Sequence, residues 1–388
     1  MKLAASRTAE PNSLRATVML AFLGSAGIYF INIAPAVVDG MQLAMGFSSR
    51  QAGMVTAANI YGAAAGAFAA ALLVRRFAWR KTATWMLALL VALDLISMLA
   101  RQPMALAAVR ALHGLAGGFL VGTAFSVFGR TARPDRVFGM LLLVQFGFGA
   151  LGILILPRVV GRLGMDAVFA AMIAFTLLTA AMLPFLPPYP APPHPAGDGT
   201  SHRTRRPWAA FAALFLFQFA NMSLAANVIR LGLSAGLTRA VVANVAGTVT
   251  ALGICGALCV ILLPVRLGRT VPLLVGYALN MGAFLLFLGS TDVRVFAIAG
   301  LASATTWSLI VPLLFGLSSA VDVSGHSAAI AGFASKLGLA TGPLCAGFLL
   351  AGGDFRKLIL VSLVAMAWSL ALGGHLAWRV DRRKDVLF

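Results

Sequence analysis

Twelve apolar segments, each close to the length that crosses a lipid bilayer, follow one another along this chain of 388 residues. A helix needs about 20 apolar residues to span a hydrocarbon core about 30 Å thick. The segments lack the alternation of barrel strands, so we predict helices. Only 11% of the residues are charged, against about 25% in a soluble domain, which excludes a soluble enzyme. The predicted spans lie at about 16–39, 51–74, 82–100, 103–128, 137–157, 165–187, 208–232, 240–263, 271–289, 294–319, 327–350 and 357–378.

A proline-rich stretch separates the first six spans from the last six. Residues 184–195 read PFLPPYPAPPHP, and prolines at this density form an extended spacer rather than a helix. The loop LLVRRFAWRK (72–81) is also similar to LLPVRLGRT (262–270) in the second half. We therefore predict an all-α integral membrane protein with two pseudo-symmetric six-helix bundles. These are residues 1–187 and 208–388, joined by a cytoplasmic linker at 188–207.

The basic residues predict the orientation in the membrane. The net charge is +19, but the basic residues are scattered between apolar runs, which excludes nucleic-acid binding. With a cytoplasmic N-terminus, 19 lysines and arginines fall in inside segments and 8 in outside segments. This bias follows the positive-inside rule. We expect a multi-pass protein of the bacterial inner membrane with both termini cytoplasmic.

Span four carries a recognisable motif, Arg110-Ala-Leu-His113-Gly114-Leu-Ala-Gly117-Gly118. It resembles the span-four signature of the major facilitator superfamily (MFS), whose usual glutamine is replaced by His113. The chain is similar to the 12-span, bacterial efflux-type branch of that family. The loop at 72–81 resembles a second family signature, but Arg75 replaces its aspartate, so that residue's role cannot be carried over. The resemblance implies the MFS fold and secondary transport.

Lys336 is the most unusual ionisable residue, because it lies near the middle of span eleven. A charged group at this depth is costly unless it is paired or hydrated. We predict that it binds an anionic solute or carries a coupling proton; the alternative is a structural ion pair. Gln145, its approximate repeat equivalent in span five, is a second candidate for solute binding.

Asp94 and Arg110 lie eight positions on either side of Gln102, where the hairpin of spans three and four turns. They are therefore expected at similar depth and able to pair, either as a structural clamp or in proton-linked switching. His113 titrates near neutrality when unperturbed and lies one helical turn from Arg110, so proton coupling and simple packing are both open. Asp39, near the outer end of span one, is a further candidate for coupling.

The family resemblance implies that certain spans line a central cavity. Polar residues in those spans are candidates for solute binding. In span one, Ser25, Tyr29, Asn32 and Asp39 share one helical face, and Pro35 is expected to kink the helix. Gln218 and Asn221 are candidates in span seven, and Trp307 in span ten. Glycines spaced four apart are expected to allow close helix contacts. These are Gly62 and Gly66, Gly114 and Gly118, and Gly338 and Gly342.

The sequence predicts a secondary active transporter for a small organic solute, possibly anionic, working by alternating access and coupled to protons. It contains no recognisable catalytic residues, metal cluster, cofactor motif or ATP-hydrolysing domain, so we predict neither enzyme activity nor a cofactor. The alternatives are a multidrug or sugar efflux pump with a mainly apolar cavity, and an uncoupled carrier. The expected partners are the solute, the lipid bilayer and protons, with the protein as a monomer.

Overall fold

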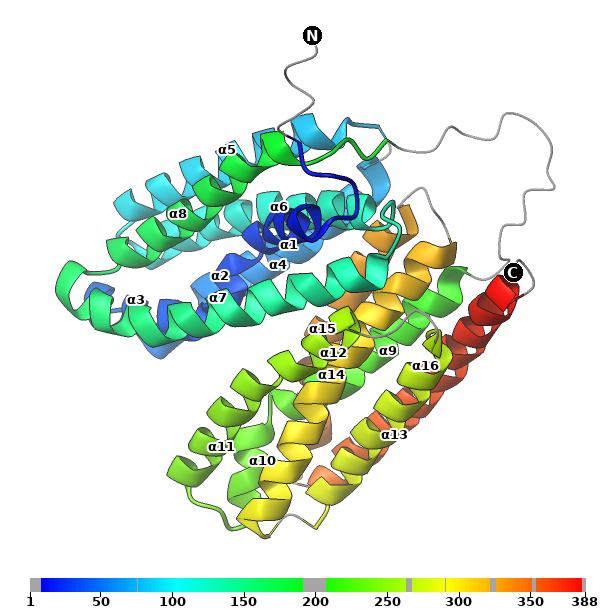
Figure 1. Ribbon diagram of the computed structural model, residues 1–388. Helices are drawn as coiled ribbons and strands as arrows, with labels where there is room; N and C mark the ends of the chain where they lie inside the picture. The colour runs from blue at the N-terminus through cyan, green and yellow to red at the C-terminus, as the bar shows by residue number, and fades with distance from the viewer. Residues whose placement is uncertain are drawn as a thin grey trace. The chain divides into compact units, whose positions relative to one another are not determined.

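The computed structural model describes residues 8–74, 76–190, 207–262, 267–289, 291–321, 326–350 and 354–385. These residues form α-helices and one 3₁₀ turn, with no β-strand among them (Figure 1). Most of the predicted linker, residues 191–206, lies outside the described residues. So do several basic residues counted for the orientation, namely Lys2, Arg7, Arg75, Arg203, Arg205, Arg206 and Arg266. The helices are α1 (Leu14–Ala26), α2 (Tyr29–Asn32), α3 (Ala34–Met45), α4 (Ser49–Leu73), α5 (Trp79–Leu99), α6 (Pro103–Phe128), α7 (Pro134–Leu163), α8 (Asp166–Met182), α9 (Pro207–Ala225), α10 (Val228–Ser234), α11 (Arg239–Leu252), α12 (Ile254–Leu262), α13 (Thr270–Phe287), α14 (Val293–Val321), α15 (His326–Leu349) and α16 (Phe355–Asp385), with the 3₁₀ turn η1 at Leu183–Phe185.

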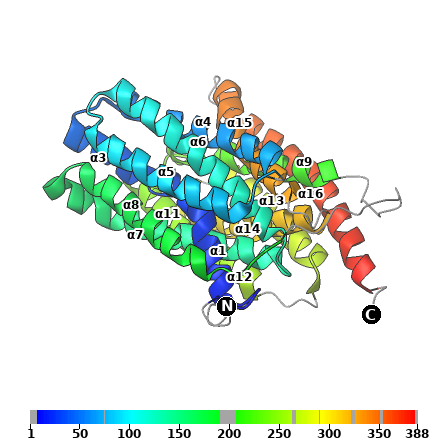
Figure 2. The same cartoon turned by 90° about the horizontal axis from the view of Figure 1, so that it is seen from above.

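The chain divides into two compact units. The first comprises Met1–Arg133, Met140–Pro193 and Val323–Phe333, and the second comprises Pro134–Gly139, His194–Asp322 and Ala334–Phe388. In the first unit α6 packs against α4 and α5, and α5 also packs against α8 (Figures 1 and 2). In the second unit α16 packs against α9, and α13 against α14. The predicted bundle boundaries at residues 187 and 208 stay a prediction.

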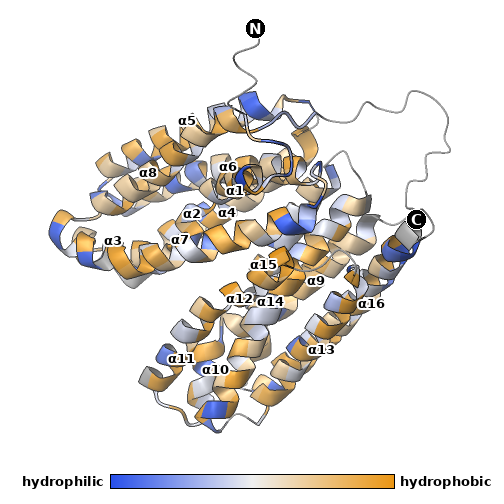
Figure 3. Ribbon diagram, viewed as in Figure 1, coloured by the Kyte–Doolittle hydropathy of each residue, from blue (hydrophilic) through white to orange (hydrophobic). Residues whose placement is uncertain are grey.

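Ten helices in the described part of the chain are long and apolar enough to cross a membrane. Hydrophobic residues cover most of the helix surfaces, and hydrophilic residues gather towards the helix ends (Figure 3). The other two predicted spans are span one, which is broken into three helices, and span eleven. Span eleven forms α15, which contains Lys336 and four glycines. The prediction of an all-helical membrane protein is confirmed.

Spans one and seven are both broken into shorter helices. In span one, α1 ends at Ala26 and α2 begins at Tyr29, and in span seven, α9 ends at Ala225 and α10 begins at Val228. Span one breaks a second time before α3, whose first turn contains Pro35, a residue without an N–H to continue the helix. At membrane depth, irregular backbone is tolerated only where protein or a water-filled cavity surrounds it. Broken helices of this kind accompany solute sites in transporters.

Glycines bring α4 and α6 of the first unit into direct backbone contact. A Cβ atom at any of four positions would overlap a carbonyl oxygen of the facing helix, at Gly62, Gly66, Gly114 and Gly118. Gly338 and Gly342 of α15 approach carbonyl oxygens of α9 in the same way. Small residues allow this closeness, and the van der Waals contact it creates is a main attraction between helices in lipid. The four-residue glycine spacing therefore marks helix contacts, as the sequence predicts.

Two arginines of the predicted cytoplasmic loops hold the segment that leads into the linker. Arg80 donates a hydrogen bond to the carbonyl oxygen of Leu186, and Arg130 Nη1 donates to that of Tyr189 at 3.1 Å. The Tyr189 ring also lies beside Trp79, with ring centroids 6.4 Å apart. The chain is thus attached to the first unit as far as Tyr189.

In the second unit, Asp381 and Asp135 bind the residues at the start of α13. The Asp381 carboxylate of α16 accepts hydrogen bonds from the N–H groups of Arg269 and Thr270, both at 2.9 Å. Asp135 accepts from Arg269 at two nitrogens, Nε at 2.9 Å and Nη2 at 2.7 Å. Burial lowers the pKa of the Arg269 guanidinium, but Asp135 and Asp381 raise it more, so the net pKa lies above the ordinary value. Asp381 therefore caps α13 from another helix and Asp135 keeps Arg269 charged.

We expect Gly118→Ala to lower the melting temperature of the purified protein. The added Cβ would collide with the Ala63 carbonyl oxygen, and overpacking of this kind costs about 1–3 kcal/mol. Gly147→Ala in α7 is the matched control, because its Cβ would meet nothing within 4 Å. Thermal unfolding in detergent, followed by tryptophan fluorescence, measures both variants. Equal melting temperatures for the two variants would contradict the packing described for α4 and α6.

Candidate functional site

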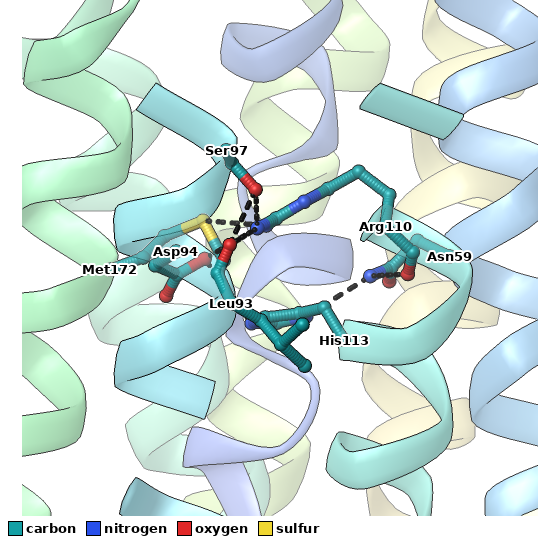
Figure 4. A network of polar contacts seen from close by, with 7 residues as sticks. All are labelled: Asn59, Leu93, Asp94, Ser97, Arg110, His113 and Met172. Atoms are coloured by element: carbon teal, nitrogen blue, oxygen red, sulfur yellow. Dashed lines mark hydrogen bonds and ion pairs between the residues drawn. The ribbon is translucent and has the colours of Figure 1, made fainter. Parts of the chain in front are cut away.

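Three ionisable side chains meet inside the first unit, Asp94 from α5 and Arg110 and His113 from α6 (Figure 4). Arg110 Nη2 lies 2.8 Å from Asp94 Oδ1, and the side chains of both residues are 0% exposed. His113 Nε2 lies 3.4 Å from the same carboxylate oxygen. We call these three residues the charged cluster. The structure thus brings together two residues that the hairpin geometry places at one depth, with His113 beside them.

The surroundings of the Arg110 guanidinium are polar on one side and aromatic on the other. Nη2 also donates to the Leu93 carbonyl oxygen at 3.1 Å and to the Ser97 hydroxyl. The guanidinium carbon lies 5.6 Å from the ring centroid of Phe30 and 5.2 Å from that of Phe169. Aromatic faces attract cations, and more strongly where water is excluded. Both rings therefore help to stabilise a guanidinium that is buried away from solvent.

The charged cluster is not saturated with hydrogen bonds. Asp94 Oδ2 and Arg110 Nε are both buried and have no hydrogen-bond partner among the described residues. The ion pair is therefore held through one carboxylate oxygen, and the second oxygen is available to bind a proton. An unpartnered buried polar atom is expensive, so the pair is less stabilising than a fully hydrogen-bonded one would be.

Asn59 of α4 contacts the charged cluster from the side opposite Asp94. Its Nδ2 atom lies 3.0 Å from the Arg110 carbonyl oxygen and 3.1 Å from His113 Nδ1. Asn59 and His113 are each only 2% exposed. The sequence prediction did not include Asn59, Ser97, Phe30 or Phe169. An amide inside the apolar span at 51–74 is the one signal that could have identified Asn59.

A second polar group lies in the second unit, around Lys336. Gln218 of α9 donates from Nε2 to Ser335 Oγ at 2.8 Å and accepts at Oε1 from Trp307 Nε1, also at 2.8 Å. Lys336 follows Ser335 directly and is partly exposed. Among the described residues, no carboxylate lies within ion-pair distance of Lys336 and no hydrogen bond holds it. The structure therefore brings Gln218 and Trp307 together, and Gln218 also contacts the residue that precedes Lys336.

Asn221 takes part in a separate buried set that connects α9, α13 and α14. Asn280 Nδ2 donates to Asn221 Oδ1 at 3.3 Å and to Thr306 Oγ1 at 2.6 Å. Asn221 Nδ2 donates to the Phe217 carbonyl oxygen at 3.0 Å within its own helix. Asn221 is thus engaged in contacts between helices, although Asn280 Oδ1 is buried without a partner in the described ranges.

The polar stripe of span one divides between buried and exposed positions. Tyr29 is buried and stacks on Phe175, with centroids 4.3 Å apart. Asn32 is half-buried, and its Nδ2 atom, like Ser25 Oγ, is buried with no hydrogen-bond partner among the residues that the structure describes. Asp39 is exposed and does not join the charged cluster.

Gln145 of α7 is half-buried, and no hydrogen bond holds it within the part of the chain that the structure describes. It lies one helical turn before Gly149, where an added Cβ would contact the Asn32 backbone at 3.2 Å. The free amide groups of Asn32 and Gln145 therefore belong to neighbouring helices, α2 and α7. Both remain candidates for solute contact.

Comparison with known proteins places this arrangement in a family. The profile described as Major Facilitator Superfamily matches residues 17–321. Two structures of FucP, a fucose:proton symporter of E. coli, are similar, with TM-scores of 0.74 and 0.71 at 14% and 16% identity. Both matches cover 93% of this chain and 97% of FucP.

Two further solved structures share the fold. The proton:xylose symporter XylE is 14% identical with a TM-score of 0.68, and the match covers 93% of each chain. The human organic anion transporter TETRAN is 15% identical with a TM-score of 0.67, and the match covers 93% of this chain and 97% of TETRAN. A search of curated protein sequences finds no significant match. The family profile covers more than half of the chain, which therefore belongs to the major facilitator superfamily and is a multi-pass membrane transporter, not an enzyme.

Proposed function

We propose that this protein is a proton-coupled secondary active transporter of a small organic anion. It works by alternating access in the bacterial inner membrane, with both termini in the cytoplasm. Within the charged cluster, Asp94 and its partner Arg110 couple transport to protons, and Lys336 attracts the anion. The observation that carries the proposal is the buried ion pair in which Asp94 Oδ2 has no partner in the part of the chain that the structure describes.

The burial of the charged cluster supports proton coupling. A lone charged side chain at the bilayer centre costs about 3 kcal/mol or more, and the Asp94–Arg110 pair avoids this by carrying no net charge. Proton binding to Asp94 Oδ2 forms one O–H bond and neutralises the carboxylate. The positive charge of Arg110 is then left without its counter-charge. The cluster thus has two charge states of different stability, which is the physical requirement for a switch.

The contacts of Asp94 favour proton binding at Oδ2 over proton binding at Oδ1. Its Oδ1 atom already accepts from Arg110 Nη2 at 2.8 Å, so a proton arriving at Oδ2 breaks no existing hydrogen bond. Once Asp94 is neutral, the attraction that holds the Arg110 guanidinium weakens. The bonds from Nη2 to Leu93 and Ser97 keep Arg110 near its position, so release of the proton restores the pair.

Lys336 supports an anionic solute. Its charge has no carboxylate partner among the described residues. An ammonium group can bind a carboxylate attached to an organic body, and the Trp307 indole, which bonds to Gln218 in the same unit, offers an apolar surface for that body. One structural neighbour, TETRAN, is itself an organic anion transporter, which agrees with this solute class.

A sugar is the second candidate solute. Amides bind hydroxyl groups, and Gln145 has no hydrogen-bond partner within the described residues. FucP and XylE are symporters of sugars. A sugar would not require the charge of Lys336, so the two solute classes are distinguished by changing that residue.

We expect Asp94→Asn to abolish proton-driven accumulation while solute exchange across the membrane continues. Asparagine keeps the shape of the side chain and the acceptor for Arg110 but cannot titrate. Uptake and counterflow in proteoliposomes measure the two activities separately. Asp166→Asn is the matched control, because Asp166 forms an exposed ion pair with Arg101 at 3.2 Å. Accumulation that survives in Asp94→Asn would refute the coupling role.

The Asp94→Asn variant leaves Arg110 unpaired, and breaking a buried pair costs about 3–5 kcal/mol. The double variant Asp94→Asn/Arg110→Gln removes both charges together and serves the same test if the single variant does not fold. It is also expected to exchange solute without accumulating it.

We expect organic anions to raise the melting temperature of the wild-type protein and to do so much less for Lys336→Gln. A ligand at 100 times its Kd stabilises a protein by about 2.7 kcal/mol, so a thermal-shift screen of mono- and dicarboxylates, sugars and lipophilic cations detects binding. The apparent Kd of an anion should rise at least tenfold in Lys336→Gln. Lys357→Gln, at an exposed lysine of α16, should bind as the wild type does. Stabilisation by sugars alone, unchanged in Lys336→Gln, would favour the second candidate solute.

A further inference from the structure

The contacts of Asn59 determine where the proton of His113 is. Asn59 Nδ2 is a donor and carries two hydrogens. One points to the Arg110 carbonyl oxygen at 3.0 Å and the other to His113 Nδ1 at 3.1 Å. A nitrogen that accepts a hydrogen bond carries no proton of its own. His113 Nδ1 is therefore unprotonated, and the ring proton is on Nε2, which faces Asp94 Oδ1 at 3.4 Å (Figure 4).

The Arg110 carbonyl oxygen prevents the side-chain amide of Asn59 from flipping. Protonation of His113 Nδ1 would need an acceptor in front of it, which Asn59 could supply only by exchanging the positions of Nδ2 and Oδ1. That rotation would place Oδ1 about 3 Å from the Arg110 carbonyl oxygen, and two acceptors at hydrogen-bond distance repel each other. The amide orientation is thus set by a backbone group of the same helix that carries His113.

The remaining neighbours of His113 do not favour a second ring proton. The charged groups that face it are Asp94 from α5 and Arg110 from its own helix, and their charges offset each other. Among the described residues, α4 contributes the neutral amide of Asn59 and α2 contributes the Phe30 ring, whose centroid lies 6.4 Å from that of the imidazole. The neighbouring α8 contributes Phe169 and Met172 to the Arg110 side. His113 therefore has one donor in front of one nitrogen and one carboxylate in front of the other.

We propose that Asn59 is a positioning residue that holds His113 neutral with its proton on Nε2, so that Asp94, and not His113, carries the coupling proton. In this arrangement the Nε2–H group of His113 faces Asp94 Oδ1, and Asp94 Oδ2 is the site of proton exchange. The coupling role of the proton on Asp94 rests on the proposed function. The state of the His113 ring is an independent physical property.

Nitrogen NMR of the histidine rings tests the proposal directly. The protein is labelled with ¹⁵N-histidine, placed in liposomes and measured by solid-state NMR between pH 5 and 8, a range that brackets the unperturbed histidine pKa of about 6.5. The His113 signals are assigned as those missing in His113→Gln, since the chain has five histidines. We expect one neutral ring with hydrogen on Nε2 at every pH. Doubly protonated His113, or hydrogen on Nδ1, would overturn the proposal.

Variants of Asn59 separate positioning from packing. Asn59→Leu removes the donor, and the His113 ring is then expected to titrate or to show both neutral forms. Asn59→Asp places an acceptor before Nδ1, so both ring nitrogens should be protonated over most of the range. Asn227→Leu is the matched control, because Asn227 is a half-buried amide of the second unit that donates to the Ser223 carbonyl oxygen. Unchanged His113 spectra in both Asn59 variants would refute the role of Asn59.

His113→Gln tests which residue carries the proton and does not depend on folding of the Asn59 variants. A glutamine can accept from Asn59 and donate to Asp94, but it cannot titrate. We expect proton-driven uptake of the anion found by thermal shift to persist within about threefold in His113→Gln and to be lost in Asp94→Asn. Loss of coupling in His113→Gln with coupling intact in Asp94→Asn would assign the proton to His113. Coupling intact in both variants would refute the proposed function, while the NMR result for Asn59 would still stand.

Discussion

A charge buried at membrane depth must be neutralised within the protein, and the first unit is organised around that constraint. Arg110 is fully buried, and among the described residues its counter-charge is Asp94 on the neighbouring helix. Because the pair connects α5 to α6, the two helices cannot separate without exposing a charge to hydrocarbon. The rings of Phe30 and Phe169 extend the same requirement to α2 and α8. One ion pair thus ties the packing of four helices to the protonation of one carboxylate.

Much of the fold could be predicted because bilayer thickness imposes a length on every span. The Asp94–Arg110 contact was also predictable, since both residues are eight positions from the turn at Gln102 and a hairpin places such residues at one depth. The contact of Asn59 with His113 was not predictable in this way. It depends on which faces of spans two and four meet, and sequence spacing alone does not contain that information.

The breaks in the helices of spans one and seven are only partly predictable from the sequence. Pro35 explains the break before α3, but no proline lies between Ala225 and Val228, where span seven is interrupted. Local propensity therefore does not account for the break in span seven, which we attribute to tertiary contacts.

The surroundings of Lys336 are also determined by helix packing. Its lack of a carboxylate partner among the described residues depends on the helices beside α15, and no motif encodes it.

The glycine contact between α4 and α6 has an electrostatic consequence as well as a steric one. Gly114 follows His113 directly, and its missing side chain allows the Asn59 backbone carbonyl to approach α6. The same approach brings the Asn59 amide within 3.1 Å of the imidazole. A residue with no side chain therefore helps to decide the tautomer of its neighbour. In this protein, the spacing of two helix backbones is part of the acid–base chemistry.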